Sequence, residues 1–122
     1  MKKVVTMIAA VLILAACSKE NVSLGKYSAI TNDGTLCIEL LSGGDCVLYF
    51  DGGTERQGDY KLSGDEIVIH GHADIKTSTK WRWYYFTVDN PGRIESSTKF
   101  TVPVEISSGD KTTTKTLTFL KR

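Results

Sequence analysis

Closely spaced turn signals constrain the fold of this chain more than any other feature of its sequence. Clusters of Gly, Asn, Asp, Ser and Pro recur as TNDGT, LSGGD, FDGGT, LSGDE, DNPG and SSGDK. Glycine and asparagine readily adopt the positive φ angles that tight hairpins require. The segments between the clusters are rich in β-branched and aromatic residues, and none after residue 24 keeps apolar residues at helical spacing. The pattern predicts consecutive β-hairpins.

Several segments between these turns have the composition of strands, namely 26–30, 35–41, 46–50, 58–62, 66–70, 81–88, 99–106 and 115–120. We therefore expect an all-β domain, either an antiparallel up-and-down barrel of about eight strands or a β-sandwich. Closure of a barrel would also remove exposed strand edges. Phe100, Val102, Val104 and Ile106 alternate with polar residues and form a predicted core face. Pro103 has no N–H to donate, which indicates an edge or a bulge in that strand.

The first seventeen residues have the three parts of a secretory signal. Two lysines precede an apolar run over residues 4–14, which is shorter than the ~20 residues that span a bilayer. The run ends in LAAC, where Cys17 follows two alanines. This segment resembles the lipobox of bacterial lipoproteins, whose cysteine is acylated and becomes the new N-terminus. The alternatives are a plain signal peptide with an incidental cysteine, or a buried apolar helix.

The lipobox resemblance sets the expected domain organisation. Residues 1–16 are a signal peptide that is removed, residues 17–24 are a lipidated tether, and residues 25–122 are a single β domain. Two acyl chains hold a protein stably on a membrane, so we expect a lipid-anchored protein of the bacterial cell envelope, on the outer membrane. The sequence does not decide whether the protein faces the periplasm or the outside of the cell. Without the two lysines of the signal, 13 basic residues stand against 14 acidic ones, and this near-neutral balance argues against nucleic acid as a partner.

Two stretches of the predicted domain resemble small lipocalin-like lipoproteins of Gram-negative bacteria. They are LGKYS, residues 24–28, and GDYKLSGDEIVIHGH, residues 58–72, with their Gly-x-Tyr hairpin signals. Tyr27 stands where lipocalins proper have tryptophan. The resemblance implies an up-and-down barrel that binds a small apolar molecule.

The first candidate site combines His70, His72 and Asp74, which share one face of a strand at a period of two. Imidazoles and a carboxylate are reasonable zinc ligands. The other face of the strand is more apolar, so we expect these side chains to point to solvent, with Gly71 marking a nearby strand end. They are a candidate metal site, but because they face solvent we expect no metal.

The second candidate site is the aromatic face formed by Trp81, Trp83 and Tyr85 in WRWYYF. Inside a barrel this face would line a cavity for an apolar or ring-shaped ligand. If it is partly exposed, it would hold a protein or a sugar by stacking. Packing of the core alone is the third alternative, and the one that the small size of the domain favours.

Cys37 and Cys46 form a candidate disulfide, since secretion places them in an oxidising compartment. If Gly43-Gly44 is a two-residue hairpin loop, Leu41 lies opposite Cys46, and Cys37 lies ~13 Å farther along the same face. That exceeds the roughly 7 Å limit for a disulfide, but a longer or bulged loop would change the distance. The bridge and a pair of small buried side chains both remain open.

No Gly-x-Ser-x-Gly elbow and no Asp-x-Asp-x-Asp-Gly calcium loop occurs in the sequence. We therefore expect a binding protein without a cofactor rather than an enzyme. Its partners would be the membrane, through the N-terminal lipid, and a small apolar or ring-containing ligand. The alternative is a module that interacts with or inhibits another protein through loops at the barrel end, such as DGGTERQGD, residues 51–59.

Replacing the candidate lipid-attachment residue tests the anchor. We expect Cys17→Ser to abolish incorporation of radiolabelled palmitate and to release the protein from membranes washed with alkaline carbonate, because the acyl chains supply the attachment. Palmitate labelling of the variant at the level of the parent protein would refute the lipobox assignment.

Overall fold

The computed structural model describes residues 22–77 and 82–122, so Cys17 and the signal segment lie outside the described residues. Their strands are β1 (Gly25–Thr31), β2 (Gly34–Leu40), β3 (Asp45–Phe50), β4 (Arg56–Ser63), β5 (Glu66–Thr77), β6 (Arg82–Val88), β7 (Pro91–Ser96), β8 (Lys99–Ser108) and β9 (Lys111–Lys121). A single 3₁₀ turn, η1 (Ser42–Gly44), joins β2 to β3. Within the described part, no helix has the length and apolar character needed to cross a bilayer.

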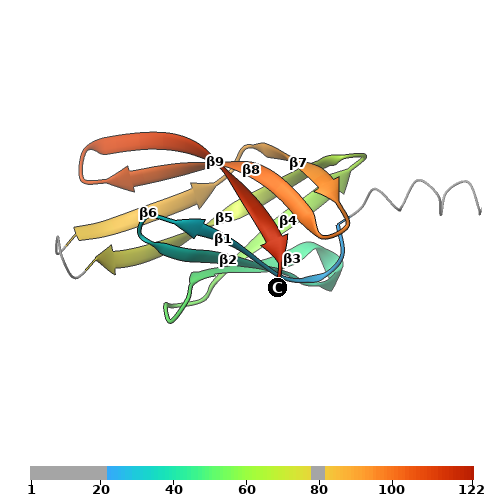
Figure 1. The fold of residues 1–122 in the computed structure, drawn as a ribbon, viewed down its shortest axis with the longest axis horizontal. Helices are drawn as coiled ribbons and strands as arrows, with labels where there is room; N and C mark the ends of the chain where they lie inside the picture. The colour runs from blue at the N-terminus through green and yellow to red at the C-terminus, as the bar shows by residue number, and fades with distance from the viewer. Residues whose placement is uncertain (1–21, 78–81) are drawn as a thin grey trace, which may run out of the picture.

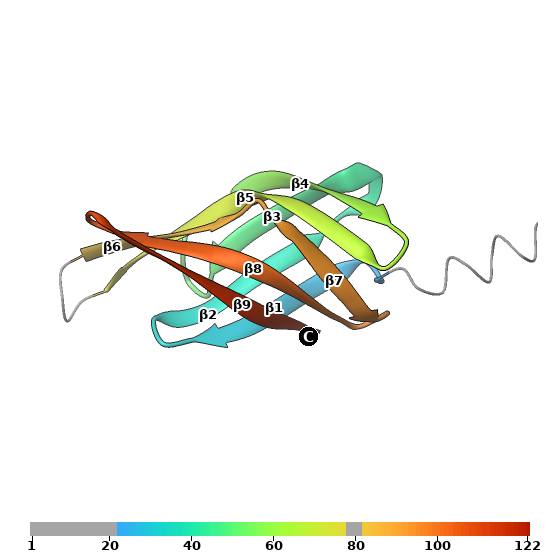
Figure 2. The same ribbon diagram turned by 90° about the horizontal axis from the view of Figure 1, so that it is seen from above.

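The strands form one closed antiparallel β-barrel, as the turn pattern predicts (Figures 1 and 2). Neighbouring strands follow the order β4-β3-β2-β1-β9-β8-β6-β5, and pairing of β5 with β4 completes the ring. The barrel alternative is therefore correct, and the sandwich alternative is wrong. All the predicted strand segments lie within observed strands, except residue 81, which lies outside the described residues, and Leu41, which follows the end of β2.

Strands β6 and β7 share one position in the barrel between β5 and β8. Their register with β5 is continuous, since Val88 lies opposite Gly71 and Pro91 opposite Val68. Their register with β8 is interrupted, because the five residues 88–92 lie opposite only three residues of β8, 102–104. The extra residues lie between β6 and β7, because the register of β8 with β9 is continuous. Pro103 lies opposite them, where β8 has no strand partner on that side and the missing N–H costs no ladder bond, so the local edge predicted from Pro103 is confirmed.

The core consists of the inward-facing residues of every strand. Its fully buried aromatic rings are in contact: those of Tyr27 and Phe100 lie 4.9 Å apart, and those of Phe50 and Phe86 lie 4.7 Å apart in an edge-to-face arrangement. Such pairs are favoured over face-to-face stacking. The predicted core face of β8 is confirmed, with Phe100, Val102 and Val104 fully buried and Ile106 packed against the core.

The described chain begins at the end of the barrel that carries the β4–β5 and β7–β8 turns (Figures 1 and 2). Val22 is buried with the core, so the folded part includes residues that the sequence assigned to the tether. The Ser23 N–H donates to the carbonyl of Ser97 at 2.8 Å, and Lys121 Nζ donates to Ser23 Oγ at 3.0 Å. We call this the anchor end. The opposite end, with the β1–β2, β3–β4 and β8–β9 turns, is called the rim.

The seam between β1 and β9 is the shortest pairing that closes the ring. Only Tyr27 with Lys121 and Ser28 with Leu120 lie opposite each other. The Arg122 N–H extends the seam by donating to the carbonyl of Lys26 at 2.9 Å. The barrel is therefore closed at the anchor end, and β1 and β9 separate toward the rim.

Close packing at the β7–β8 bulge gives a test of the fold. A Cβ added at Gly92 would overlap Val102 Cγ1 and the carbonyl oxygen of Thr101. Because backbone must move to relieve the overlap, Gly92→Ala should destabilise the protein by about 1–3 kcal/mol in urea unfolding. Glu95→Ala, on an exposed position of the same strand, should change stability by less than ~0.5 kcal/mol. Equal stability of both variants would contradict the described packing.

Candidate functional site

A cavity of about 240 Å³ opens at the rim between the β3–β4 loop and strand β5. It exists because β5 pairs with β4 only as far as His70 and then continues to Thr77 without it. Its walls are residues 50–54 on one side and residues 74–76 with Trp83 on the other. The pocket combines the carboxylates of Asp51 and Asp74 and the hydroxyl of Thr54 with a large aromatic ring. We call it the rim cavity.

The aromatic face of β6 lies outside the barrel. Trp83 and Tyr85 are each 47% exposed, whereas Phe86 is fully buried and Tyr84 packs against the core. Core packing and an interior ligand are therefore both wrong for Trp83 and Tyr85, and the partly exposed alternative stands. Trp81, the third member of the predicted face, lies outside the described residues. The sequence could not decide the orientation, because both faces of this strand carry large rings.

Two of the three candidate metal ligands, His70 and Asp74, are held by separate partners on the outer surface. Nδ1 of His70 hydrogen-bonds the carboxylate of Asp89, and Arg56 donates to Asp74 at 3.2 Å. His70 and His72 are exposed, in the orientation that the sequence predicts. Residues 22–77 and 82–122 contain no group of three or more His, Cys, Asp or Glu side chains that could hold a metal ion. Gly71 does not mark a strand end, because β5 passes through it.

The candidate disulfide between Cys37 and Cys46 is not formed, and both cysteines are free and buried. The assumed register is wrong by one residue: Cys46 lies opposite Leu40, not Leu41. A shift of one residue moves a side chain to the other face of the sheet. Cys46 therefore lies in the core, where burial raises the pKa of its thiol to about 12, while Cys37 faces outward.

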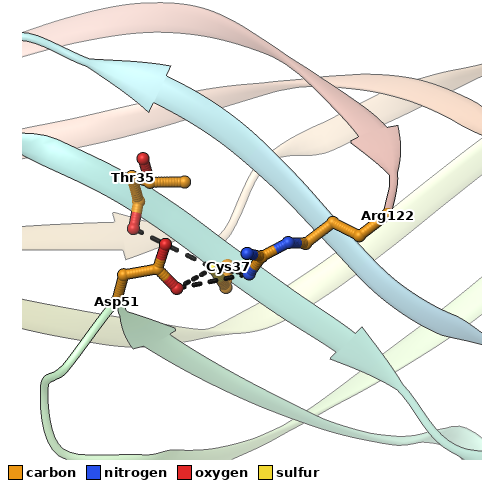
Figure 3. Close-up of polar contacts among 4 residues, drawn as sticks. All are labelled: Thr35, Cys37, Asp51 and Arg122. Atoms are coloured by element: carbon orange, nitrogen blue, oxygen red, sulfur yellow. Dashed lines mark hydrogen bonds and ion pairs between the residues drawn. The ribbon is translucent and has the colours of Figure 1, made fainter.

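Cys37 is covered by two charged side chains on the outer face of the barrel (Figure 3). Its thiol donates to Asp51 Oδ1 at 3.3 Å. Arg122 Nη1 lies 3.2 Å from the same oxygen and 3.3 Å from the sulfur, so its guanidinium spans β1 and closes over β2. This contact extends the β1–β9 seam toward the β3–β4 loop. Asp51 thus belongs both to the Cys37 cluster and to the rim cavity.

The charges around Cys37 set the ionisation of the cluster. Burial, followed by the hydrogen bond to Asp51, raises the pKa of the Cys37 thiol. The bond from that thiol and the contact with Arg122 lower the pKa of Asp51 below its ordinary value of 3.8. The stabilisation from ionised Asp51 is therefore present above that value and is lost as the pH falls through the lowered pKa. A thiol with a raised pKa is a poor nucleophile, so Cys37 supports the loop and does not suit covalent chemistry.

The rim cavity offers hydrogen-bond acceptors and an aromatic wall within one pocket. Sequence reasoning identified Trp83 and Asp74 as candidates, but for different sites, and treated Asp51 as a turn residue. Thr54 was considered only as part of the candidate interaction loop, residues 51–59. The signal for this combination was the Gly52-Gly53 pair, which lets the loop fold back: the Gly53 N–H donates to the carbonyl of Phe50 at 2.7 Å. The position of this loop beside β5 depends on closure of the barrel and could not be predicted from the local sequence.

No known family, curated protein or solved structure matches this chain.

Alkylation of the cysteines tests the Cys37 cluster. Asp51→Asn removes a group that raises the pKa of Cys37 and frees Arg122 from its ion pair, so iodoacetamide should modify Cys37 faster. The rate rises up to about tenfold for each unit by which the pKa falls. Peptide mass mapping would report both cysteines, and core-facing Cys46 should stay protected. Glu55→Gln, in the same exposed loop, is the matched control. An unchanged rate at Cys37 in Asp51→Asn would contradict the assigned contacts.

Proposed function

We propose that this protein is a lipid-anchored binding protein of the bacterial cell envelope, and that it holds a polar, ring-containing ligand such as a sugar in the rim cavity. The observation that carries the proposal is the lining of that cavity, in which Trp83 stands beside Asp51, Asp74 and Thr54. Carboxylates and a hydroxyl suit the hydroxyl groups of such a ligand, and the indole ring suits its apolar face.

The size and position of the rim cavity favour a ligand with a single ring over a lipid. Pockets for drug-sized ligands span roughly 300–1,000 Å³, and the rim cavity, at about 240 Å³, is smaller. The space inside the barrel, where the lipocalin-like resemblance would place an apolar ligand, holds packed rings such as Phe50, Phe86 and Phe100. An apolar ligand is therefore the less favoured occupant.

The proposed anchor would present the rim to the surroundings. Four residues separate Cys17 from Val22, which is buried at the anchor end. A chain segment of that length reaches at most about 18 Å. A lipid on Cys17 would therefore hold the anchor end near the bilayer, with the rim cavity on the far side.

A second candidate function is recognition of a protein at the rim. Residues 51–57 of the β3–β4 loop and its junction with β4 are all exposed, and several are charged. Charged, exposed loops on a filled barrel suit a protein partner, which would make the molecule an interaction or inhibitor module.

Saturation-transfer NMR would test the ligand proposal with a fixed panel of neutral hexoses, amino sugars and single-ring aromatic compounds. We expect signals from at least one sugar, and loss of those signals in Trp83→Ala, because the indole forms one wall of the cavity. Leu24→Ala is the matched control, since Leu24 is 49% exposed at the anchor end. Absence of transfer to every sugar, or equal transfer in both variants, would refute the proposal.

A further inference from the structure

An unpaired strand edge runs along β9 from the rim toward the seam (Figure 2). β9 pairs with β8 from Lys111 to Leu120, but it meets β1 only at Leu120 and Lys121. Along residues 111–119, the side of β9 away from β8 has no strand partner in the described part of the chain. Such an edge presents free backbone N–H and C=O groups and can template pairing with another strand.

A slot of about 140 Å³ opens beside this edge, where β1 and β9 separate. Ile30 and Asp33 lie on the side of the β1–β2 hairpin, and Lys115 and Leu117 lie on the side of β9. Phe86, which is fully buried, forms part of the lining, so the slot reaches the core. Ile30 is 87% exposed, although isoleucine is usually buried. The slot would accept one apolar side chain.

The charges along the edge select the partner. Lys111 and Lys115 share the slot-side face of β9 with Leu117, since they alternate at a period of two. Residues 111–119 contain no acidic residue, and Asp33 and Asp110 lie in the turns that flank the edge. Glu105 of β8 pairs with Thr114, which lies on the other face of β9 from the two lysines. Residues opposite each other on paired strands share a face, and opposite charges there are stabilising. A strand paired with this edge would place carboxylates opposite the lysines and an apolar residue opposite Leu117.

We propose that the β9 edge binds an extended, acidic segment of a partner protein by strand addition, with an apolar side chain of that segment in the slot beside Leu117. Main-chain bonds to the edge supply affinity in this mode of recognition, and alternate side chains supply specificity. A second copy of this chain fits less well. Antiparallel pairing of two β9 edges would gather Lys111 and Lys115 of both copies on one face, where like charges repel.

Fluorescence anisotropy would test the proposal with the full chain in detergent and a labelled octapeptide, Thr-Val-Thr-Glu-Thr-Thr-Thr-Glu, whose valine and two glutamates share one face at the spacing of Leu117, Lys115 and Lys111. We expect saturable binding, and we expect the same peptide with lysine in place of each glutamate to bind at least tenfold more weakly. An acidic peptide N-methylated at alternate residues, on the side that would face β9, should not bind, because it cannot donate to the edge.

Charge reversal on β9 is the matching change in the protein. The double variant Lys111→Glu with Lys115→Glu should bind the acidic peptide about tenfold or more weakly, because two attractive cross-strand pairs become repulsive. Lys61→Glu with Lys99→Glu makes the same change in charge on exposed positions of β4 and β8 and should leave affinity unchanged. Circular dichroism would establish that both variants fold.

Three results would overturn the assignment. They are no binding of the acidic peptide, equal binding of the acidic and basic peptides, and retained binding of the N-methylated peptide. Concentration-dependent dimerisation that is lost in Lys111→Glu with Lys115→Glu would assign the edge to a second copy and would also overturn it. None of these results bears on the rim cavity, so the sugar proposal stands or fails separately.

Discussion

The short seam between β1 and β9 determines how the rest of the barrel is arranged. Backbone pairing closes the ring over two residue pairs. At the anchor end Tyr27 donates to the carbonyl of Ser23 at 2.7 Å and Lys121 reaches Ser23, whereas Arg122 crosses β1 in the other direction to Asp51. A barrel that is closed in this way has one tight end and one end where strands diverge. The rim cavity and the β9 edge both lie toward the divergent end.

The chain positions these features with ordinary local chemistry. Asp51 joins the seam to the β3–β4 loop, because the same carboxylate accepts from Cys37 and Arg122 and lines the rim cavity. On the opposite wall Trp83 lies outside the barrel because Phe86, on the alternate face of β6, fills the core. In our proposal the lipid holds the tight end at the membrane, so that ligand and partner meet the divergent end.

The architecture could be predicted from the sequence, but the register and the faces could not. Turn chemistry and alternation located the strands, and Pro103 correctly indicated a local edge in β8. Pro91 and Gly92 were read as a turn, although they begin β7, because a strand that follows a bulge tolerates both residues. The β2–β3 loop holds one residue more between paired positions than the assumed two-residue loop, and this shift places Cys37 and Cys46 on opposite faces of the sheet. The edge of β9 was unexpected, since closure was predicted to remove free edges.

Residue-resolved hydrogen exchange of the full chain tests the account most directly, because exchange protection reports which amides are paired. We expect slow exchange at the seam, at residues 27–28 and 120–122. We also expect fast exchange at alternate amides of residues 112–118 of β9, which face away from β8. Uniform slow exchange along all of β9 would show that a strand covers the edge, and would contradict a barrel closed only at the anchor end.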